Sequence, residues 1–293
     1  MLIFASFLVV LLIAAIVIFG FGVLLIAGVA LATGVAIEFL FAKIRKKEMD
    51  VISWLISPLI LTLFMPATAP WWLILIATFF GVFFGKAVFG GHGKNVFNPA
   101  VVGVLFATIS FPAQMNTSWI NPQTGVISAT TPLTILNRGL AFDYSIMDLL
   151  LGNVAGALGE TFRLGIIILG LILVVLKIAD WRIPTFYIGS VFLMTWMGGL
   201  IAPESFRDPV LTLFVGGVLF TAFFVATDPV TLPIQPSGRI IFAVGLAFFT
   251  VLIRNFSAFP EGVIFAIILM NAIAPLIDQW VEPKKMKETE VIA

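Results

Sequence analysis

The first 37 residues carry no charged side chain, and Glu38 is the first ionisable side chain of the sequence. A membrane-spanning helix needs about 20 apolar residues, so this run is long enough for two spans. We place the hinge between them near Gly20 and Gly22. Across the whole chain the mean hydropathy is +1.16 and only 11% of residues are charged. Water-soluble domains do not hide so much apolar surface, so the sequence predicts an all-α polytopic membrane protein.

Ten apolar segments have roughly the length of a membrane span, five in each half of the chain. Because five is odd, the two halves would cross the membrane in opposite orientations, which is the inverted-repeat plan of many transporters. Residues 77–86 (ATFFGVFFGK) resemble residues 246–254 (LAFFTVLIR), and residues 97–106 loosely resemble residues 259–268, which supports such a repeat weakly. The expected spans are 2–18, 20–42, 51–66, 70–88, 98–113, 163–179, 185–202, 209–226, 238–253 and 261–280.

The chain therefore divides into four expected units. Residues 1–113 form a first five-helix repeat, and residues 114–145 form a polar segment. Residues 146–280 form the second repeat, which begins with a short broken or re-entrant piece over 146–158. Residues 281–293 form a charged tail.

The distribution of Lys and Arg predicts which side of the membrane each loop faces. If both termini are cytoplasmic, twelve of the 16 cations lie inside and four lie outside, whereas the opposite orientation reverses these numbers. Segment 114–145 is therefore expected outside, and residues 90–95 inside. The inner set is Lys43, Arg45, Lys46, Lys47, Lys86, Lys94, Lys177, Arg182, Arg239, Lys284, Lys285 and Lys287, and the outer set is Arg138, Arg163, Arg207 and Arg254.

The stretch FGGHGKNVFNPA (89–100) interrupts the apolar pattern with glycines and amides. It is not a phosphate-binding Walker loop, because Lys94 is followed by Asn95 and not by Ser or Thr. His92 is the only histidine, which favours an interfacial residue over a metal ligand. A second break over residues 227–238 is expected on the same side, and irregular backbone at membrane depth must be buried or line a cavity. Together the two breaks predict a polar pocket.

Acidic residues at membrane depth cost about 2.5–3.5 kcal/mol on insertion, so each is a candidate for an ion path. For Glu38 the alternative is a snorkelling side chain or a pair with Lys43. The absence of cysteine excludes disulfides and iron–sulfur ligation by this chain, and the net charge of +1 predicts no nucleic-acid partner. The candidates are Glu38, Glu160, Asp228, Glu261 and Asp278.

Four stretches resemble the signature segments of one family, the RnfD/NqrB membrane subunits of ion-translocating electron-transport complexes. They are GKAVFGGHGKNVFNPA (85–100), GALGET (156–161), FFVATDPVTLP (223–233) and RNFSAFPEGVIFAIILMNAIAPLID (254–278), in the family's order. The chain resembles RnfD more than NqrB, because NqrB subunits have a longer N-terminal extension. The resemblance implies the ten-span inverted repeat, related to urea-channel architecture.

The resemblance also implies a covalent flavin. Family members carry FMN joined through its phosphate to a threonine, and a flavin transferase installs it on the outer side at a short Ser/Thr-Gly/Ser-Ala-Thr sequence. In GVISATTPLT (125–134), Ser128-Ala129-Thr130 matches this pattern and favours Thr130. The Thr-Pro-Leu ending of the family pattern selects Thr131 instead. The sequence departs from the family upstream, where an Asp is expected and Thr124 or Gly125 stands.

A second, non-covalent flavin is implied for the inner pocket, because NqrB-type members hold riboflavin within the membrane. By this resemblance the backbone of Gly91 and Gly93 approaches the ring edge, and Asn95 and Asn98 hydrogen-bond to it. Glu160 and Asp228, with Thr227, are expected to face the same cavity.

The resemblance implies a translocase component, the RnfD subunit of an Rnf-type complex in a prokaryotic inner membrane. It passes electrons between ferredoxin and NAD, coupled to Na⁺ or H⁺ transport. Its expected partners are the other subunits, including a second covalent-FMN subunit, and the flavin transferase. The alternatives are an NqrB-type subunit of a quinone-reducing sodium pump, a urea-channel-like transporter and a purely structural scaffold.

Overall fold

The computed structural model describes residues 1–46, 53–257, 259 and 261–281. Over these ranges the chain is helical except for one two-stranded hairpin and the connecting segments. The longer helices are α1 (Leu2–Phe19), α2 (Gly22–Ile44), α3 (Ser53–Phe64), α4 (Trp71–Val82), α5 (Pro99–Ser110), α9 (Arg163–Val175), α10 (Arg182–Ile201), α13 (Pro236–Phe256) and α14 (Gly262–Val281).

The remaining elements are short. Two π-helices, η1 (Phe83–Ala87) and η2 (Thr221–Val225), extend α4 and α12. The antiparallel hairpin pairs β1 (Trp119–Ile120) with β2 (Ile127–Ser128). The short helices are α6 (Pro112–Asn116), α7 (Pro132–Asn137), α8 (Ile146–Leu151), α11 (Pro209–Phe214) and α12 (Val218–Phe220).

Five of the described helices are long and apolar enough to cross a membrane, namely α1, α2, α10, α13 and α14. Shorter apolar helices include α5 and α9. Large apolar side chains also cover the outside of the molecule, with Val17 80% exposed and Phe21 82% exposed. Such a surface is stable against lipid and not against water, so the chain is a polytopic membrane protein.

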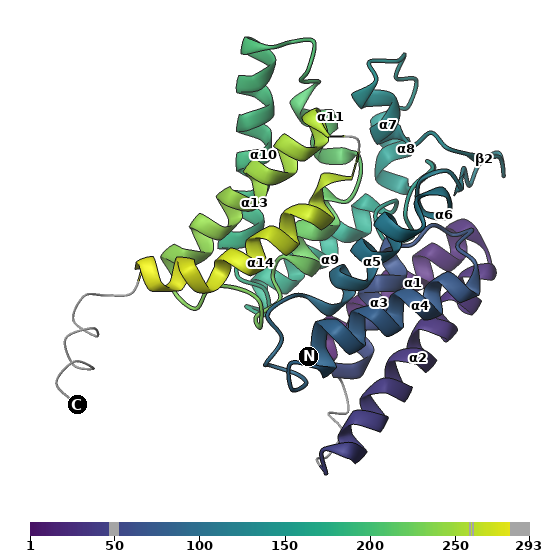
Figure 1. Cartoon of the computed structure of the whole chain (residues 1–293). Coiled ribbons are helices and arrows are strands. Elements are labelled where there is room, and N and C mark those ends of the chain that lie inside the picture. Colours follow the sequence, from purple (N-terminus) through teal and green to yellow (C-terminus); the bar gives the residue numbers. More distant parts are fainter. Residues whose placement is uncertain (47–52, 258, 260, 282–293) are drawn as a thin grey trace.

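The helix pairs that touch follow the same order in the two halves of the chain. In the first half α2 packs on α3 and α4, α4 packs on α5, and α1 packs on α3. In the second half α10 packs on α11 and α13, α13 packs on α14, and α9 packs on α12. Figure 1 shows α1–α5 gathered at the lower right and α10, α13 and α14 at the left, with α5 against α14 between them.

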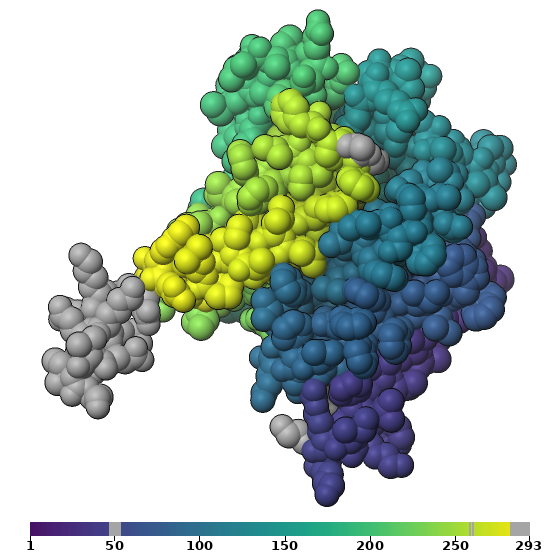
Figure 2. All heavy atoms as spheres, in the orientation of Figure 1, coloured from purple at the N-terminus to yellow at the C-terminus, as the bar shows by residue number. Residues whose placement is uncertain are grey.

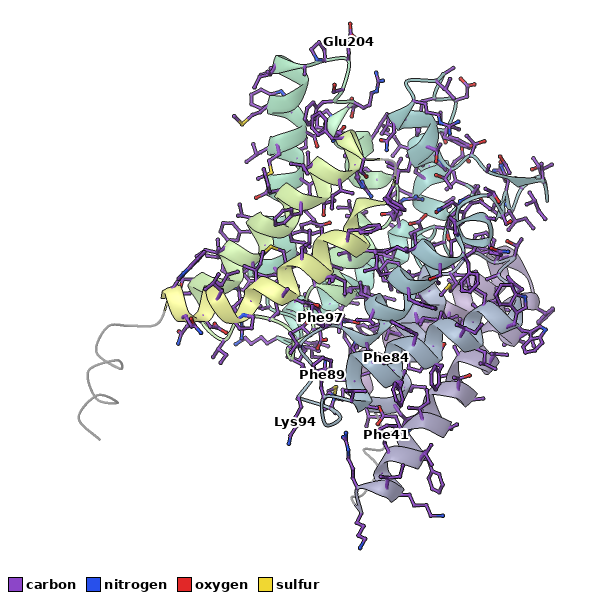
Figure 3. All side chains as sticks on the ribbon, viewed as in Figure 1. Phe41, Phe84, Phe89, Lys94, Phe97 and Glu204 are labelled. Atoms are coloured by element: carbon purple, nitrogen blue, oxygen red, sulfur yellow. The ribbon has the colours of Figure 1, made fainter. Side chains whose placement is uncertain are left out.

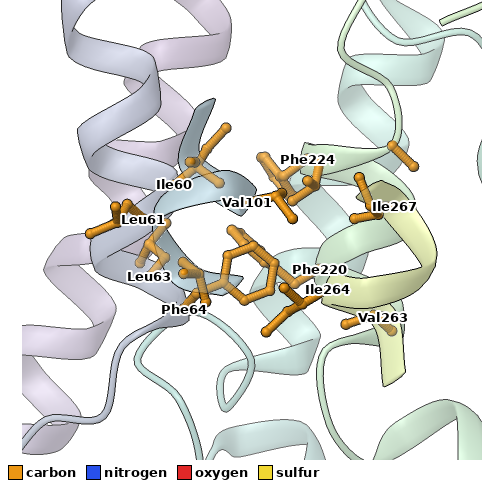
Figure 4. Packing of buried hydrophobic residues seen from close by; sticks show 14 of the residues in the cluster. Ile60, Leu61, Leu63, Phe64, Val101, Phe220, Phe224, Val263, Ile264 and Ile267 are labelled. Atoms are coloured by element: carbon orange, nitrogen blue, oxygen red, sulfur yellow. The ribbon is translucent and has the colours of Figure 1, made fainter. Parts of the chain in front are cut away.

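Aromatic and branched side chains fill the space between the halves (Figure 4). Phe64 of α3 meets Phe220 of α12 edge to face, with ring centroids 5.2 Å apart. Phe220 stacks on Phe224 of η2 at 5.6 Å. Val101 of α5 and Ile264 of α14 belong to the same buried cluster. Aromatic pairs of this geometry add about 0.5–1.5 kcal/mol to the burial of their area, so this contact joins the halves firmly.

Non-helical backbone in the interior is paired with other non-helical backbone. The amide of Gly159 donates to the carbonyl of Leu63 at 2.6 Å, and the amide of Leu158 donates to that of Met65 at 3.1 Å. The carbonyls of Leu63, at the end of α3, and of Met65, just after it, are thereby satisfied by residues 158 and 159, which precede α9. Buried backbone groups need such partners, because an unpaired one costs several kcal/mol in an apolar medium.

One expectation about a continuous segment was wrong. The predicted span 209–226 is broken between α11 and α12 at Gly216, whose φ is +65°, a conformation that favours glycine. The piece over 146–158, which was expected to be broken or re-entrant, is helical only in α8, which ends at Gly152 in the left-handed conformation. In both places a glycine ends the helix and the following residues enter the interior as irregular backbone. The predicted tail 281–293 lies outside the described residues apart from Val281.

The two sets of loops lie at opposite ends of the molecule. Figure 3 shows Lys94 at the lower end and Glu204 at the upper end, and we name the ends after these residues. The Lys94 end includes the start of α1 and the end of α2. The Glu204 end includes the segment between α5 and α9, which forms the teal surface at the upper right of Figure 2.

Close packing of α4 on α5 gives a stability prediction. A Cβ added at Gly103 of α5 would lie 2.7 Å from Leu61 Cδ1 and against the Ala77 carbonyl. We expect Gly103→Ala to lower the free energy of unfolding by about 1–3 kcal/mol through overpacking. Thermal melting of the purified protein in detergent measures the change. Gly28→Ala on α2, where nothing lies within 4 Å of the added atom, is the matched control, and equal melting temperatures for both variants would contradict the prediction.

Candidate functional site

A cavity of about 220 Å³ opens at the Lys94 end. Its lining comes from segments far apart in the sequence, because α1, α3, η1 and η2 converge where the backbone breaks after each π-helix. The polar residues on its wall are Ser57, Lys86, His92, Asn95, Asn98, Thr227 and Asp228, and apolar side chains such as Phe4, Ile60 and Phe224 line the rest. The two breaks thus meet at one cavity, as expected, but its wall is only partly polar.

Asn98 is the residue that ties this cavity together. Its backbone amide donates to Asn271 Oδ1 of α14 at 3.1 Å, and its Nδ2 donates to Asp228 Oδ2 at 3.3 Å. Its Oδ1 accepts from the amides of Ala100 and Val101 and caps α5. A single buried asparagine thus joins the break before α5, the break after η2 and the middle of α14.

Lys86 provides the positive charge at this cavity. It lies on η1, its side chain is 2% exposed, and its Nζ is 2.5 Å from Glu38 Oε1 of α2. The expected alternative for Glu38, a pair with Lys43 or a snorkelling carboxylate, is wrong. Glu38 faces inward to a buried lysine because α2 packs along α4 and η1, which brings the two side chains together.

The glycines and amides of the 89–100 stretch take several roles. Gly90, Gly91 and Gly93 all have positive φ, which explains the glycine-rich sequence. Gly93 faces open space, and Asn95 Nδ2 donates to the Phe97 carbonyl. The amide side chains of Asn95 and Asn98 are therefore partly used within the chain itself.

Asp278 is not part of this cavity. Its Oδ1 accepts from the amide of Ile234 at 2.8 Å and from that of Gln235 at 3.5 Å. It holds the connection between η2 and α13 against the end of α14, which is a structural role.

A second, smaller cavity of about 60 Å³ lies at the Glu204 end. It is lined by Glu160, Glu261, Thr131 and Thr134, among others, and its floor includes Phe64. The expectation that Glu160 shares the pocket of Asp228 is therefore wrong. Glu160 belongs to the break before α9, which packs on the break after α3, whereas Asp228 belongs to the break at the other end.

Two buried arginines balance the two glutamates of this second cavity. Arg254 Nη2 lies 3.0 Å from Glu261 Oε1, which also accepts from the amide of Gly217 at 3.1 Å. Glu160 Oε1 accepts from the amide of Ala157 at 3.0 Å. Arg163, 1% exposed, donates to the carbonyls of Leu149 and Thr161. Residues 77–86 and 246–254, which resemble each other in sequence, thus both end in a buried cation paired with a carboxylate.

Packed aromatic rings separate the two cavities. Phe64 lines the cavity at the Glu204 end, and Phe224 with Phe4 lines the cavity at the Lys94 end. Phe220 lies between Phe64 and Phe224 and contacts both rings. A polar route between the ends must therefore pass this aromatic layer.

The neighbouring threonines Thr130 and Thr131 face different surroundings. Thr131 is buried and caps α7, where its hydroxyl accepts from the amide of Thr134 at 3.2 Å. Thr130 is half-buried, and its hydroxyl lies 2.8 Å from that of Ser128. It faces a separate open groove of about 450 Å³, whose lining includes Leu140 and Tyr144.

Sequence reasoning missed that Lys86 lines a cavity and that Arg163 and Arg254 are buried near the glutamates of the other. The charge rule places these three cations only at loop ends. The signal that would have found them is their position next to long apolar runs, where a cation needs an acidic or carbonyl partner.

The pair of Lys86 and Glu38 gives a second prediction. We expect Lys86→Met to destabilise the protein by about 3–5 kcal/mol, because it leaves the Glu38 carboxylate buried without its cation. Adding Glu38→Gln in the same chain should restore part of the loss. Urea unfolding of the purified protein in detergent measures both. A double variant less stable than Lys86→Met alone would contradict the pairing.

Comparison with known proteins gives the family. The model of the NQR2, RnfD, RnfE family matches residues 1–287. The chain is 33% identical to the D-type subunit of the ion-translocating oxidoreductase complex of Shewanella frigidimarina (strain NCIMB 400), with 91% of this chain and 87% of that protein aligned. It is 34% identical to the protein of the same name from Yersinia pseudotuberculosis serotype O:1b (strain IP 31758), over 91% and 87% of the two chains.

A third relative carries a more detailed name. The D-type subunit of the Na⁺-translocating ferredoxin:NAD⁺ oxidoreductase complex of Acetobacterium woodii is 32% identical, over 94% of this chain and 86% of its own length. The family model extends over both halves of the molecule and both cavities, and each relative aligns with more than nine-tenths of the chain. The chain therefore belongs to the NQR2, RnfD, RnfE family.

Proposed function

We propose that this chain is the RnfD subunit of an Rnf-type ion-translocating oxidoreductase complex and carries FMN on Thr130. The family and the names of its relatives support the complex. The observation that carries the redox role is the groove beside Thr130, which a solute channel or a scaffold would not need. Within the complex the chain passes electrons between ferredoxin and NAD, coupled to Na⁺ or H⁺ transport.

The groove beside Thr130 fits a covalent flavin, and the cavity beside Thr131 does not. Ligand sites usually have volumes of about 300–1,000 Å³. The groove of about 450 Å³ lies within this range, and the cavity of about 60 Å³ does not. The Thr131 hydroxyl is also occupied as a helix cap. We therefore assign the phosphoester to Thr130, with Ser128 orienting its hydroxyl before a transferase acts.

When bound, FMN supplies one- and two-electron transfer at its ring. The chain's own residues hold that ring in place. Leu140 and Ile135 offer apolar contact, and Tyr144, which packs edge to face on Phe142, offers an aromatic wall. The groove opens on the surface of the molecule, which suits exchange of electrons with a second covalent-FMN subunit and access for the flavin transferase.

The cavity at the Lys94 end does not fit the riboflavin that the resemblance implies. At about 220 Å³ it is smaller than usual ligand sites, and the amide groups of Asn98 are already bonded. We propose that it takes the coupling cation with its water. Asp228 and Asn98 offer oxygen ligands there, and the Lys86–Glu38 pair sets the local charge.

We propose that ions cross between the two cavities in a ten-span inverted repeat. The matching helix pairs of the two halves and the buried cation in each half support the repeat. Glu160 and Glu261 serve the cavity at the Glu204 end, and the aromatic layer around Phe220 closes the route between conduction events. The charge rule supports a cytoplasmic position for the Lys94 end and for both termini.

The acceptor threonine is tested by fluorescence of the denatured protein. We expect Thr130→Ala to abolish the covalent flavin, so that its band is dark under ultraviolet light when the chain is produced with a flavin transferase. Thr131→Ala should stay fluorescent and lose about 1 kcal/mol of stability, because it removes a helix cap. A dark Thr131→Ala band beside a fluorescent Thr130→Ala band would reverse the assignment.

The cation site is tested by Asp228→Asn. A hydrogen bond or contact to a charged group is worth about 1.5–3 kcal/mol, so we expect the apparent affinity for the coupling ion to fall by about tenfold or more. Ion uptake by proteoliposomes containing the purified complex measures this. Asp143→Asn, on an exposed loop at the other end, is the control. Wild-type ion dependence in Asp228→Asn would remove Asp228 from the path.

A further inference from the structure

A basic pocket of about 360 Å³ lies beside the cavity of the Lys94 end. Its lining includes Lys177, Asp180, Trp181, Arg182 and Arg239. Three of these side chains are cations and one is an anion. The pocket therefore carries an excess of positive charge and favours an anionic ligand.

The two arginines are held in place by Asp180. Its Oδ2 lies 2.6 Å from Arg239 Nη1 and 3.2 Å from Arg182 Nη1. Partial burial raises the pKa of Asp180. The hydrogen bonds from the amide of Arg182 and the guanidinium of Arg239 lower it by more, so the pKa lies below its ordinary value. The carboxylate stays ionised at neutral pH and fixes the start of α13 against the start of α10. Each arginine side chain remains about 30% exposed, and its guanidinium can donate further hydrogen bonds.

Lys177 supplies the third cation. It follows the end of α9 in a left-handed turn with φ +56° and is exposed. Among the residues that the structure describes, no carboxylate forms an ion pair with it. Its ammonium group is thus available to a ligand in the pocket.

The surroundings of the pocket have the polarity of a membrane interface. Directly before Lys177, Val175 is 79% exposed and Leu176 is 50% exposed at the end of an apolar helix. Trp181 is 51% exposed, and the guanidinium of Arg182 lies over its ring at 5.3 Å. Tryptophan and basic residues gather at the level of lipid headgroups, with apolar side chains below them. Apolar surface continuous with a basic pocket fits a lipid better than a free anion.

We propose that this pocket binds the phosphate headgroup of an anionic glycerophospholipid such as phosphatidylglycerol. Lys177, Arg182 and Arg239 contact the phosphate, and Val175, Leu176 and Trp181 contact the upper part of the acyl chains. The site is independent of the flavin and of the proposed electron transfer.

The pocket shares part of its wall with the cation cavity. Ile178, Thr227 and Pro229 line both, and Thr227 and Pro229 flank Asp228. A lipid in the pocket therefore packs against the irregular segment that carries Asp228 and steadies it.

The test is site-resolved cross-linking on the purified complex. A photoactivatable phosphatidylglycerol is titrated in detergent, and its adducts on residues 164–182 are read by peptide mass spectrometry. One Lys or Arg near an anionic lipid contributes enough to change affinity about fivefold, so Lys177→Gln should raise the half-saturation concentration by about that factor. Lys43→Gln, an exposed lysine at the end of α2 outside the pocket, should leave it unchanged.

Competition separates a lipid from a free anion. Unlabelled phosphatidylglycerol should displace the probe, whereas phosphatidylcholine and millimolar inorganic phosphate should not. Equal cross-linking in Lys177→Gln and wild type would overturn the proposal, as would displacement by phosphate or by phosphatidylcholine. Since Lys177 is exposed, thermal melting of the variant should match wild type and exclude misfolding as the cause of a loss.

Discussion

Backbone polar groups at membrane depth must find hydrogen-bond partners within the protein, and the arrangement of this fold follows from that requirement. Breaks between helices from distant parts of the chain lie together in the interior. The amides of Leu158 and Gly159 bond to carbonyls at the end of α3. Asn98 joins the break before α5 to Asp228 in the break after η2. The first pairing satisfies the backbone, and both bring together side chains that could not meet on continuous helices.

The two cavities follow from those pairings. At each end one member of a carboxylate–cation pair lines a cavity: Lys86, which pairs with Glu38, lines one, and Glu261, which pairs with Arg254, lines the other. Between them the rings of Phe64, Phe220 and Phe224 exclude water. Polar groups at both ends with an apolar middle support the stepwise ion route that we propose. Thr130, which we propose as the flavin acceptor, precedes Thr131, which lines the cavity at the Glu204 end, so a flavin there would bring its charge near that cavity.

Most of the fold could be predicted because it follows from apolar length and turn residues. Nine of the ten expected spans correspond to one helix, or one helix extended by a π-helix, and the glycines of the 89–100 stretch have the positive φ that their sequence indicates. The remaining span, 209–226, is broken at Gly216, and the carboxylate of Glu261, just before α14, accepts a hydrogen bond from the amide of Gly217. That partner lies 44 residues away along the chain, and no local pattern reveals it.

The candidate site was predictable in its residues and not in their grouping. Asp228, Asn95 and Asn98 line one cavity as expected, but Glu160 lies in the other and Asp278 in neither. A polar residue within an apolar segment can be recognised from the sequence. Which of these residues lie together depends on how the helix breaks pack in the folded protein, and the sequence does not show that.

The most direct test of the central claim is peptide mass spectrometry of the chain purified from its native complex. The redox role predicts that the peptide containing residues 121–138 carries the mass of an FMN phosphoester, with fragment ions that place it on Thr130. An unmodified peptide from a complete and active complex would contradict the claim, and the two cavities would then be better explained by a channel for an ion or a small solute.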